Sequence, residues 1–434
     1  MQPLPRPQLI VKTTGKLTLL LTLSLFALTT QAAPEILLPR HRLFAHELAI
    51  VVNDEDPLSQ RIGAYYQKAR NIPPENVLHI RFKPGRPRIN EAEFKQLYQQ
   101  IQKATPPGVQ AYALTWAAPW RVECMSITTA FTFGFNRTYC SETRCAKTRF
   151  SPLYNSVSVS PYDDFAARPA IAIASTNFEQ ARALIDRGVA SDGTQPPGTA
   201  WLVSTTDRAR NIRSIYYPLV MKAMYGWIDT RIAETDALNH VADILFYFTG
   251  RVNVTGLETL KFRPGAIADH LTSAGGQLTT SKQMSALRWL EAGAAGSYGT
   301  VTEPCNLPGK FPHPGLVIDA YGSGRTLIEA YWQSVQQPGE GIFIGEPLAA
   351  PFDSKNVEVK DDHILLTTRT LTPGQYRLSS SENTVGPFKQ IPGVLTVDYH
   401  QQAFRLPKLN ARYYRLELVR RGGARNLREV LINS

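Results

Sequence analysis

The sequence predicts an α/β protein, with a three-layer αβα domain built on a mainly parallel sheet and a small β unit after it. The first observation is a set of short apolar, β-branched runs such as LAIVV at residues 48–52, which are typical of strands buried on both faces. The second is that these runs alternate with amphipathic segments of helical periodicity. The third is a change of composition beyond Pro351, where short alternating segments are separated by Gly, Pro, Asn and Ser.

The first part of the chain shows the alternation most clearly. Asp56-Pro57 is a helix-opening pair, and the sequence NIPP at residues 71–74 stops that helix. The expected elements are strands at 48–52, 77–82 and 111–116, and helices at 58–70 and 91–104. Because strand, helix and strand follow one another, we expect parallel pairing with right-handed crossovers.

Residues 117–168 interrupt the alternation. This segment is rich in Thr, Ser, Tyr, Arg and Pro, and it contains three of the four cysteines. A long segment without periodicity is usually functional, or an excursion fixed to the core. The alternation then resumes, with strands expected at 170–174, 200–204, 243–248, 295–301 and 341–344 and helices at 178–188, 209–225, 281–292 and 324–335.

The last part of the chain indicates a small antiparallel β unit. The expected strands lie at 364–370, 375–378, 393–399 and 413–419. The predicted organisation is therefore a signal peptide at 1–33, an αβα domain at 34–350 with its excursion at 117–168, and a β unit at 351–434.

The N-terminus has the three parts of a secretory signal peptide. Arg6, Lys12 and Lys16 precede an apolar run at residues 17–28, and the small residues TTQAA follow, with cleavage expected after Ala32 or Ala33. A run of about a dozen apolar residues is too short to cross a bilayer, and we expect no transmembrane segment in the mature chain. The sequence thus predicts export, to the periplasm, the cell surface or the medium.

The charge balance bears on the class of partner. The formal net charge is +11, and the first 33 residues carry three Lys or Arg and no acid, so the mature chain has 11 − 3 = +8. A basic chain favours an anionic or cell-envelope partner, although no specific partner follows from the sequence. The basic residues are scattered, so no nucleic-acid role is indicated.

Four cysteines suit an oxidising compartment, and we expect disulfides among Cys124, Cys140, Cys145 and Cys305. Cys140 and Cys145 flank four residues and can close on each other, which would leave Cys124 for Cys305. Three connectivities are possible and the sequence does not choose among them. No CxxC pair or HExxH motif occurs, so neither a metal nor a cofactor is predicted.

Long strings of the mature chain resemble a family of exported bacterial proteins to which no activity is assigned. The similar strings are LAIVVNDEDPLSQRIGAYYQKARNIPPENV, ALTWAAPWRVEC, ADHLTSAGGQLTTSKQMSALRWLEAGAAGSYGTVTEPCN and EAYWQSVQQPGEGIFIGEPLAAPF. This resemblance implies an exported bacterial protein and leaves its chemistry open.

Two of the same segments are similar to the gingipain–caspase–separase class of cysteine peptidases. They are MSALRWLEAGAAGSYGTVTEP, which resembles the segment after the nucleophile, and IFIGEPLA, which resembles the end of the catalytic domain. The resemblance implies an αβα sheet carrying a His-Gly at one strand end and an Ala-Cys at the next. This chain has Thr249-Gly250 and Ala274-Gly275 there, so the dyad of the class is missing.

The segment DHLTSAGG at residues 269–276 holds the densest set of reactive side chains. His270 and Ser273 are three residues apart, so a helical turn would put both on one face. Gly275 and Gly276 would let a loop approach a ligand closely. Cys305 with His270 is a second nucleophile–base pair to consider, against a disulfide at Cys305.

A binding cleft is predicted around these groups, because ligands of open α/β sheets sit beyond the carboxyl ends of strands. Aromatic, Arg and acidic residues after the strands suit a sugar or peptide. The cleft residues are Asn53, Asp54, Trp116, Trp120, Arg121, Glu123, Gly275, Gly276 and Glu303.

These observations predict a peptidase-like binding or accessory protein that has lost its dyad. The alternative is a hydrolase acting on peptide or glycan, which would use His270 with Ser273 or Cys305.

Overall fold

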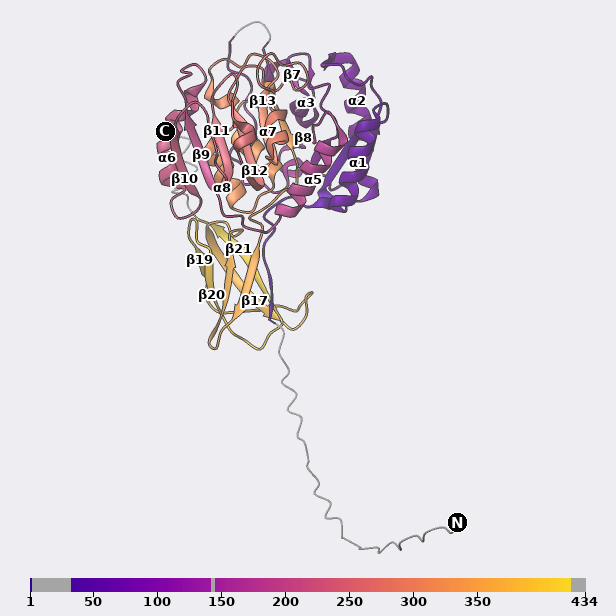
Figure 1. Ribbon diagram of the computed structural model, residues 1–434. Helices are drawn as coiled ribbons and strands as arrows, with labels where there is room; N and C mark the ends of the chain where they lie inside the picture. The colour runs from indigo at the N-terminus through magenta and orange to yellow at the C-terminus, as the bar shows by residue number, and fades with distance from the viewer. Residues whose placement is uncertain (2–32, 142–144, 423–434) are drawn as a thin grey trace, which may run out of the picture. The chain divides into compact units, whose positions relative to one another are not determined.

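A ten-stranded sheet is the centre of the protein (Figure 1). The computed structural model describes Met1 and residues 33–141 and 145–422. The strands of this sheet lie in the order β10-β9-β11-β12-β13-β14-β8-β5-β2-β3. The signal peptide predicted at 1–33 lies almost wholly outside the described residues.

One half of the sheet comes from the first part of the chain. β2 pairs in parallel with β3 and β5, and β5 pairs in parallel with β8. All six residues of β2 are buried, as a strand covered on both faces requires. The bounds are β2 Leu48–Asn53, β3 Val77–Ile80, β5 Ala111–Leu114 and β8 Ala170–Ala172.

The other half holds the remaining strands. Parallel pairing joins the strands from β10 through β9, β11 and β12 to β13. The next strand, β14, pairs antiparallel with β13. One residue pair, Ile344 with Ala172, joins β14 to β8. The bounds are β9 Thr199–Ser204, β10 Asp229–Glu234, β11 Ile244–Thr249, β12 Phe262–His270, β13 Gly296–Thr300 and β14 Gly341–Gly345.

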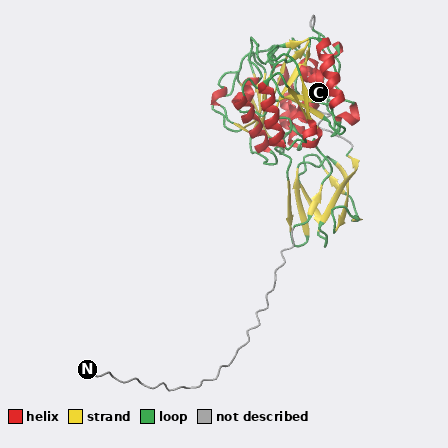
Figure 2. Ribbon diagram, turned by 90° about the vertical axis from the view of Figure 1, so that its right-hand side faces the viewer, coloured by secondary structure: helices red, strands yellow, loops and turns green. Residues whose placement is uncertain are grey.

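Helices cover both faces of the sheet (Figure 2). Successive strand residues point to opposite faces: Asp269 contacts Arg213 in η4, and His270 contacts Trp289 in α7. α5 lies on the face of α7, because Arg187 donates to the carbonyl oxygens of Leu290 and Ala294. α1 packs on α5, whereas α8 packs on α6 and α9. The bounds are α1 Pro57–Arg70, α2 Glu91–Ala104, α5 Phe178–Ser191, η4 Asn211–Tyr216, α6 Tyr217–Ala223, α7 Leu287–Ala292, α8 Pro314–Gly322 and α9 Leu327–Ser334.

Local sequence explains where the helices begin. Asp56 caps α1 by accepting the N–H of Leu58, with Pro57 at the first helical position, and Asn71 ends the helix in the left-handed conformation at φ 52°. Asn90 caps α2 and Asn177 caps α5 in the same way. These caps are local signals, which is why the sequence places these three helices well.

The excursion predicted at 117–168 packs onto the core. It contributes β6 and β7 of a three-stranded sheet with β4, and the short helix α3. Thr129 Oγ1 donates to the Pro338 carbonyl at 2.8 Å, and the Asn155 N–H donates to the Gln333 carbonyl at 2.8 Å. The bounds are β4 Arg88–Ile89, β6 Arg121–Val122, β7 Met125–Ser126 and α3 Ile127–Phe133.

The C-terminal strands form a sandwich of two sheets with a core of their own (yellow in Figure 1). One sheet has the order β1-β21-β17-β18, with β19 beside β17, and the other has the order β15-β16-β20. β1 pairs in parallel with β21, so its residues belong with this sandwich and not with the αβα portion predicted to start at 34. The bounds are β1 Glu35–Leu37, β15 Lys355–Val359, β16 His363–Thr368, β17 Gly374–Ser381, β18 Lys389–Gln390, β19 Leu395–Val397, β20 Ala403–Pro407 and β21 Tyr413–Arg421.

The α/β class with a mainly parallel central sheet is confirmed, and several elements differ from the prediction, among them α8, β15 and β20, which the sequence did not predict. The helix expected at 281–292 starts only at Leu287, and the segment at 209–225 is η4 followed by α6. β12 and β10 were not predicted. β12 contains Pro264-Gly265 in its middle, a pair that normally signals a turn, and only its last six residues are fully buried.

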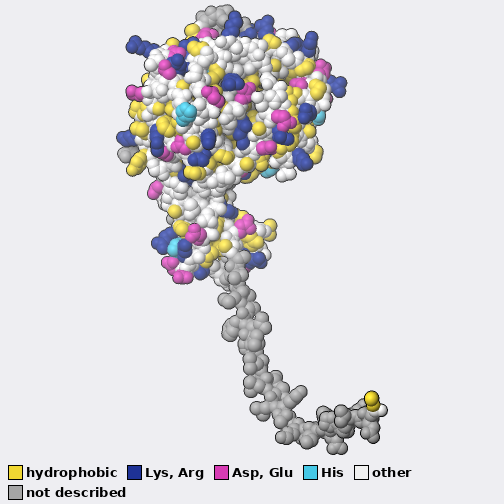
Figure 3. All heavy atoms as spheres, viewed as in Figure 1, with side chains coloured by type: hydrophobic (Ala, Val, Ile, Leu, Met, Phe, Trp, Pro, Cys, Tyr) yellow, Lys and Arg dark blue, Asp and Glu magenta, His cyan; other side chains and the backbone are white. Residues whose placement is uncertain are grey.

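The surface mixes both signs of charge. On the face shown in Figure 3, Lys and Arg side chains lie among Asp and Glu side chains. Within the described residues, no helix has the length and apolar character to cross a membrane.

Candidate site at the ends of β11 and β12

Of the residues predicted to be catalytic, His270 is the last residue of β12, Ser273 lies in the loop after it, and Cys305 lies in the segment after β13. Thr249, the last residue of β11, is the register partner of His270, the last residue of β12. Asp269 and His270 are each 1% exposed and point to opposite faces. Asp269 therefore does not orient the His270 imidazole, as a triad would require.

Both ring nitrogens of His270 are engaged. The Trp289 Nε1–H donates to Nδ1 at 2.9 Å, so Nδ1 is an acceptor. Nε2 then carries the proton, and it lies 3.1 Å from the Met284 carbonyl oxygen, to which it donates. This tautomer has no remaining lone pair for a nucleophile's proton, and burial lowers the pKa of His270 to about 3.

Asp269 forms a buried ion pair on the other face. Its Oδ1 lies 2.6 Å from Nη1 of Arg213, whose Nη2 donates to the Thr249 carbonyl at 2.7 Å. Burial raises the pKa of Asp269 to about 6, against the lowering effect of Arg213. The pair ties η4 to the ends of two strands, which is a structural role.

Ser273 follows β12 in an irregular segment, so the expectation that a helical turn aligns it with His270 is wrong. Its carbonyl oxygen accepts the hydroxyl of Thr300 at 3.1 Å. Gly275 does lie near His270: a Cβ on it would be 3.4 Å from the His270 Cε1. Gly276 packs on the β13 backbone, because its Cβ would be 2.5 Å from the Gly299 carbonyl oxygen. The close approach that the two glycines permit is to the protein itself.

Cys305 is bonded to Cys145, and Cys124 is bonded to Cys140. The pairing of Cys140 with Cys145 and of Cys124 with Cys305 is therefore corrected. The excursion folds back so that Cys145 reaches the segment after β13, while Thr302 Oγ1 donates to the Cys124 carbonyl at 2.9 Å. Because Cys305 is oxidised, it supplies no thiolate for the hydrolase alternative.

Two of the predicted cleft residues are core residues instead. Trp116 and Trp120 are each 2% exposed, and Trp116 packs edge-on against Phe82 and Phe131. In a sequence, aromatic residues after a strand suggest the wall of a cleft. Here these side chains fill the core beneath the excursion.

The polar cleft residues have local structural partners. Asn53 is fully buried and exchanges hydrogen bonds with the backbone of Phe82. Oδ1 of Asp54 lies 2.7 Å from Nδ1 of His79. The carboxylates of Glu123 and Glu303 each accept a backbone N–H group. Arg121 lies over the Trp120 ring, with its guanidinium carbon 5.1 Å from the ring centroid.

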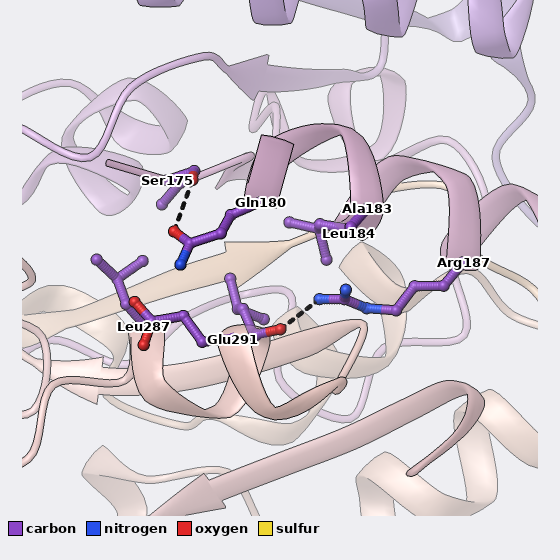
Figure 4. A pocket seen from close by; sticks show the side chains of 9 residues that line it. Ser175, Gln180, Ala183, Leu184, Arg187, Leu287 and Glu291 are labelled. Atoms are coloured by element: carbon purple, nitrogen blue, oxygen red, sulfur yellow. Dashed lines mark hydrogen bonds between the residues drawn. The ribbon is translucent and has the colours of Figure 1, made fainter. Parts of the chain in front are cut away.

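Figure 4 shows a crevice between α5 and α7. Leu184 and Leu287 line it, with Gln180 bonded to Ser175 at one side and Arg187 bonded to the end of α7 at the other. Its volume of about 60 Å³ is far below the ~300–1,000 Å³ of ordinary ligand pockets. Across the described residues, no group of three or more His, Cys, Asp or Glu side chains is placed to hold a metal ion.

A more polar hollow lies where the αβα portion meets the C-terminal sandwich. Trp227 and Asp319 come from the former, and Arg369, Tyr399 and His400 come from the latter. These residues are not predicted from the sequence, since they come from segments far apart in the chain. The one local signal was the polar aromatic pair Tyr399-His400 before a strand.

No protein-family model and no curated protein matches this chain. Three solved structures are similar to it over most of its length. Gingipain R, an Arg-specific cysteine proteinase, aligns with a TM-score of 0.41 and 9% identity, covering 85% of this chain and 93% of that one. A protease structure aligns with a TM-score of 0.37 and 10% identity, over 84% and 97% of the two chains.

The third is a complex of the pro- and mature domains of RgpB from Porphyromonas gingivalis, with a TM-score of 0.39 and 8% identity. It covers 83% of this chain and 93% of that one. Likeness at this level concerns the fold and assigns no role to any residue of this chain. The predicted family of exported proteins stays a prediction.

Proposed function

We propose that this chain is a binding or accessory protein of the bacterial periplasm or cell surface, in which a peptidase-like αβα sheet is a scaffold. The observation that carries the proposal is the state of His270. A general base needs a free lone pair within hydrogen-bond reach of the nucleophile, and His270 has committed both nitrogens to Trp289 and Met284.

The cysteines support the same proposal. All four are in disulfides, so the chain holds no free thiol in this state. Disulfides of this kind persist in oxidising compartments, which agrees with the export that the N-terminal segment predicts. The hydrolase alternative would need Ser273 to be activated without His270 and without a thiolate.

The experiment asks whether any nucleophile of the folded protein is activated. The oxidised mature chain, beginning at residue 34, is treated with a fluorophosphonate probe for activated serines and with iodoacetamide for thiols. We expect no labelling by either probe, and iodoacetamide labelling at cysteines only after reduction.

Two variants make the result specific to His270. His270→Ala removes the imidazole, and Trp289→Phe removes the indole N–H together with part of the buried ring, which would release Nδ1 as a base. Fluorophosphonate labelling at Ser273 that is lost in His270→Ala and increased in Trp289→Phe would refute the binding-protein proposal in favour of a serine hydrolase.

A further inference from the structure

The polar hollow between the αβα portion and the C-terminal sandwich, here called the junction hollow, has the composition of a ligand site. Its volume is about 120 Å³, twice that of the crevice between α5 and α7 but still below the ~300–1,000 Å³ of drug-sized pockets, so it can hold only a small ligand. Sites of this kind often lie between domains and combine aromatic walls with a few polar groups. The residues lining it are His41, Asn155, Val157, Trp227, Asp319, Ser323, Arg325, Arg369, Thr370, Leu371, Thr372, Pro373, Tyr399, His400 and Gln401.

Arg369 is the distinctive group of the junction hollow. Its guanidinium carbon lies 4.4 Å from the ring centroid of Trp227 and 5.0 Å from that of Phe352. Nη1 donates to the Trp227 carbonyl oxygen at 3.1 Å, which fixes the plane of the guanidinium. The side chain is therefore held in place before any ligand arrives, which lowers the entropic cost of binding.

The charge of Arg369 is not neutralised by any acidic side chain of the described residues. Within residues 33–141 and 145–422, no carboxylate forms an ion pair with Arg369, and burial is the sole influence on its pKa, lowering it to about 10. By contrast, Arg325 in the same hollow is paired with Glu329 at 3.1 Å. A half-buried cation that stays charged at neutral pH and lacks a counter-ion favours binding of an anion.

The one carboxylate in the hollow is already engaged. Asp319 is 3% exposed, and its Oδ1 accepts the hydroxyl of Tyr399 and lies 3.4 Å from Nε2 of His400. The His400 ring stacks on Trp227, with the centroids 4.3 Å apart and the planes within 4°. Asp319 thus orients two side chains of the sandwich instead of neutralising Arg369.

We propose that the junction hollow binds a small organic anion through Arg369. The ligand class is a carboxylate or phosphate group on a body no larger than a single sugar ring, with Ser323 and Gln401 as neutral polar neighbours in the hollow. The hollow is small, at about 120 Å³, so it suits a single small molecule and not a polymer chain. The inference goes beyond the proposed function, because it does not depend on whether the sheet edge is catalytic.

The test is a calorimetric titration of the mature chain with sodium glucuronate and with inorganic phosphate, using glucose as the uncharged comparison. We expect one saturable site for at least one of the two anions, competition between them if both bind, and no heat of binding for glucose. Arg369→Met should weaken the affinity roughly 10- to 100-fold, the effect of losing a charge-assisted hydrogen bond.

The matched control is Arg231→Met. Arg231 also lies over an indole ring, that of Trp201 at 5.7 Å, but on β10 outside the junction hollow, and we expect its removal to leave the affinity within about twofold. If Arg369→Met does not fold, NMR of the unsubstituted protein decides, since the indole N–H signal of Trp227 should shift on saturation with the anion. No saturable anion binding, equal binding of glucose, or a shift absent at Trp227 would overturn the proposal.

Discussion

At the scale of single residues, hydrogen bonding decides what a side chain can do. A histidine three residues from a serine, with a cysteine further along the chain, suggests catalysis. In the folded chain, the buried His270 ring donates one hydrogen bond and accepts another, so neither nitrogen is free, and burial favours its neutral form. Arg369 is the opposite case, because its sequence context gives no sign of a site, and none of the acidic side chains that the structure describes forms an ion pair with it.

The burial of His270 predicts a pH dependence of stability. Its pKa falls from 6.5 in the unfolded chain to about 3 in the fold, so the unfolded state takes up the proton first as the pH is lowered. This contribution is complete above pH 6.5 and is lost toward pH 3, at up to about 1.4 kcal/mol per pH unit. Between pH 6.5 and 4.5, the unfolding free energy of the wild type should fall by about 2–3 kcal/mol more than that of His270→Phe, measured by urea denaturation.

Comparing the wild type with His270→Phe cancels the contribution of Asp269 to the pH dependence of the unfolding free energy. The pKa of Asp269 is raised in the fold, so this residue adds stability as the pH falls and opposes His270. Because Asp269 is present in both proteins, the difference reports His270 alone. Identical pH dependence in the two proteins would mean that His270 is protonated normally and remains available as a base.

At the scale of elements, the ends of β12 and β13 are brought together by glycine. Gly276 lies against the backbone of Gly299, and its N–H donates to the Thr300 carbonyl at 2.9 Å. The sequence presents Gly275-Gly276 as a ligand-approaching loop, and the fold uses the second glycine to let this segment cross β13 without a side chain between them.

Alanine substitution at Gly275 and at Gly276 tests whether contact with β13, rather than loss of backbone freedom, makes the second glycine necessary. In Gly276→Ala, the new Cβ would meet the Gly299 carbonyl oxygen at 2.5 Å, so backbone must move and the unfolding free energy should fall by about 2–3 kcal/mol. In Gly275→Ala, the nearest atom is the Thr272 Cγ2 at 3.3 Å, and we expect a loss of about 1 kcal/mol or less. Denaturant titrations measure both, and an equal effect of the two substitutions would contradict this packing.

At the scale of the whole molecule, long-range connections fix the excursion to the core and join β1 to β21. The bond between Cys145 and Cys305 spans 160 residues and fixes the excursion to the segment after β13. β1, near the start of the described chain, completes a sheet with β21 near its end. These connections join parts of the chain that the sequence gives no reason to pair.

The disulfide connectivity predicts a peptide map. Trypsin separates the four cysteines into the peptides 122–137, 138–144, 145–147 and 289–310. Non-reducing mass spectrometry should show the first joined to the second and the third joined to the fourth. A link between 138–144 and 145–147 would contradict the structure.

The cost of losing each bond gives a second measurement of connectivity. Chain entropy assigns about 5 kcal/mol to the 160-residue loop and about 3 kcal/mol to the 16-residue loop. Replacing Cys145 and Cys305 by serine should therefore lower the unfolding free energy more than the same double change at Cys124 and Cys140, apart from any cavity effect at the buried pair.

The sequence by itself determined the α/β class, the strands that are buried on both faces and the helices with strong caps, such as those starting after Asp56 and Asn90. These features depend on residues close together in the chain, because periodicity and capping are local. Tertiary structure decided the strand β12, the disulfide partners and the state of His270, because each depends on groups that approach only after folding. The junction hollow is the clearest case. In it, Trp227 and Asp319 line the same space as Arg369 and His400, although these residues are far apart in the sequence.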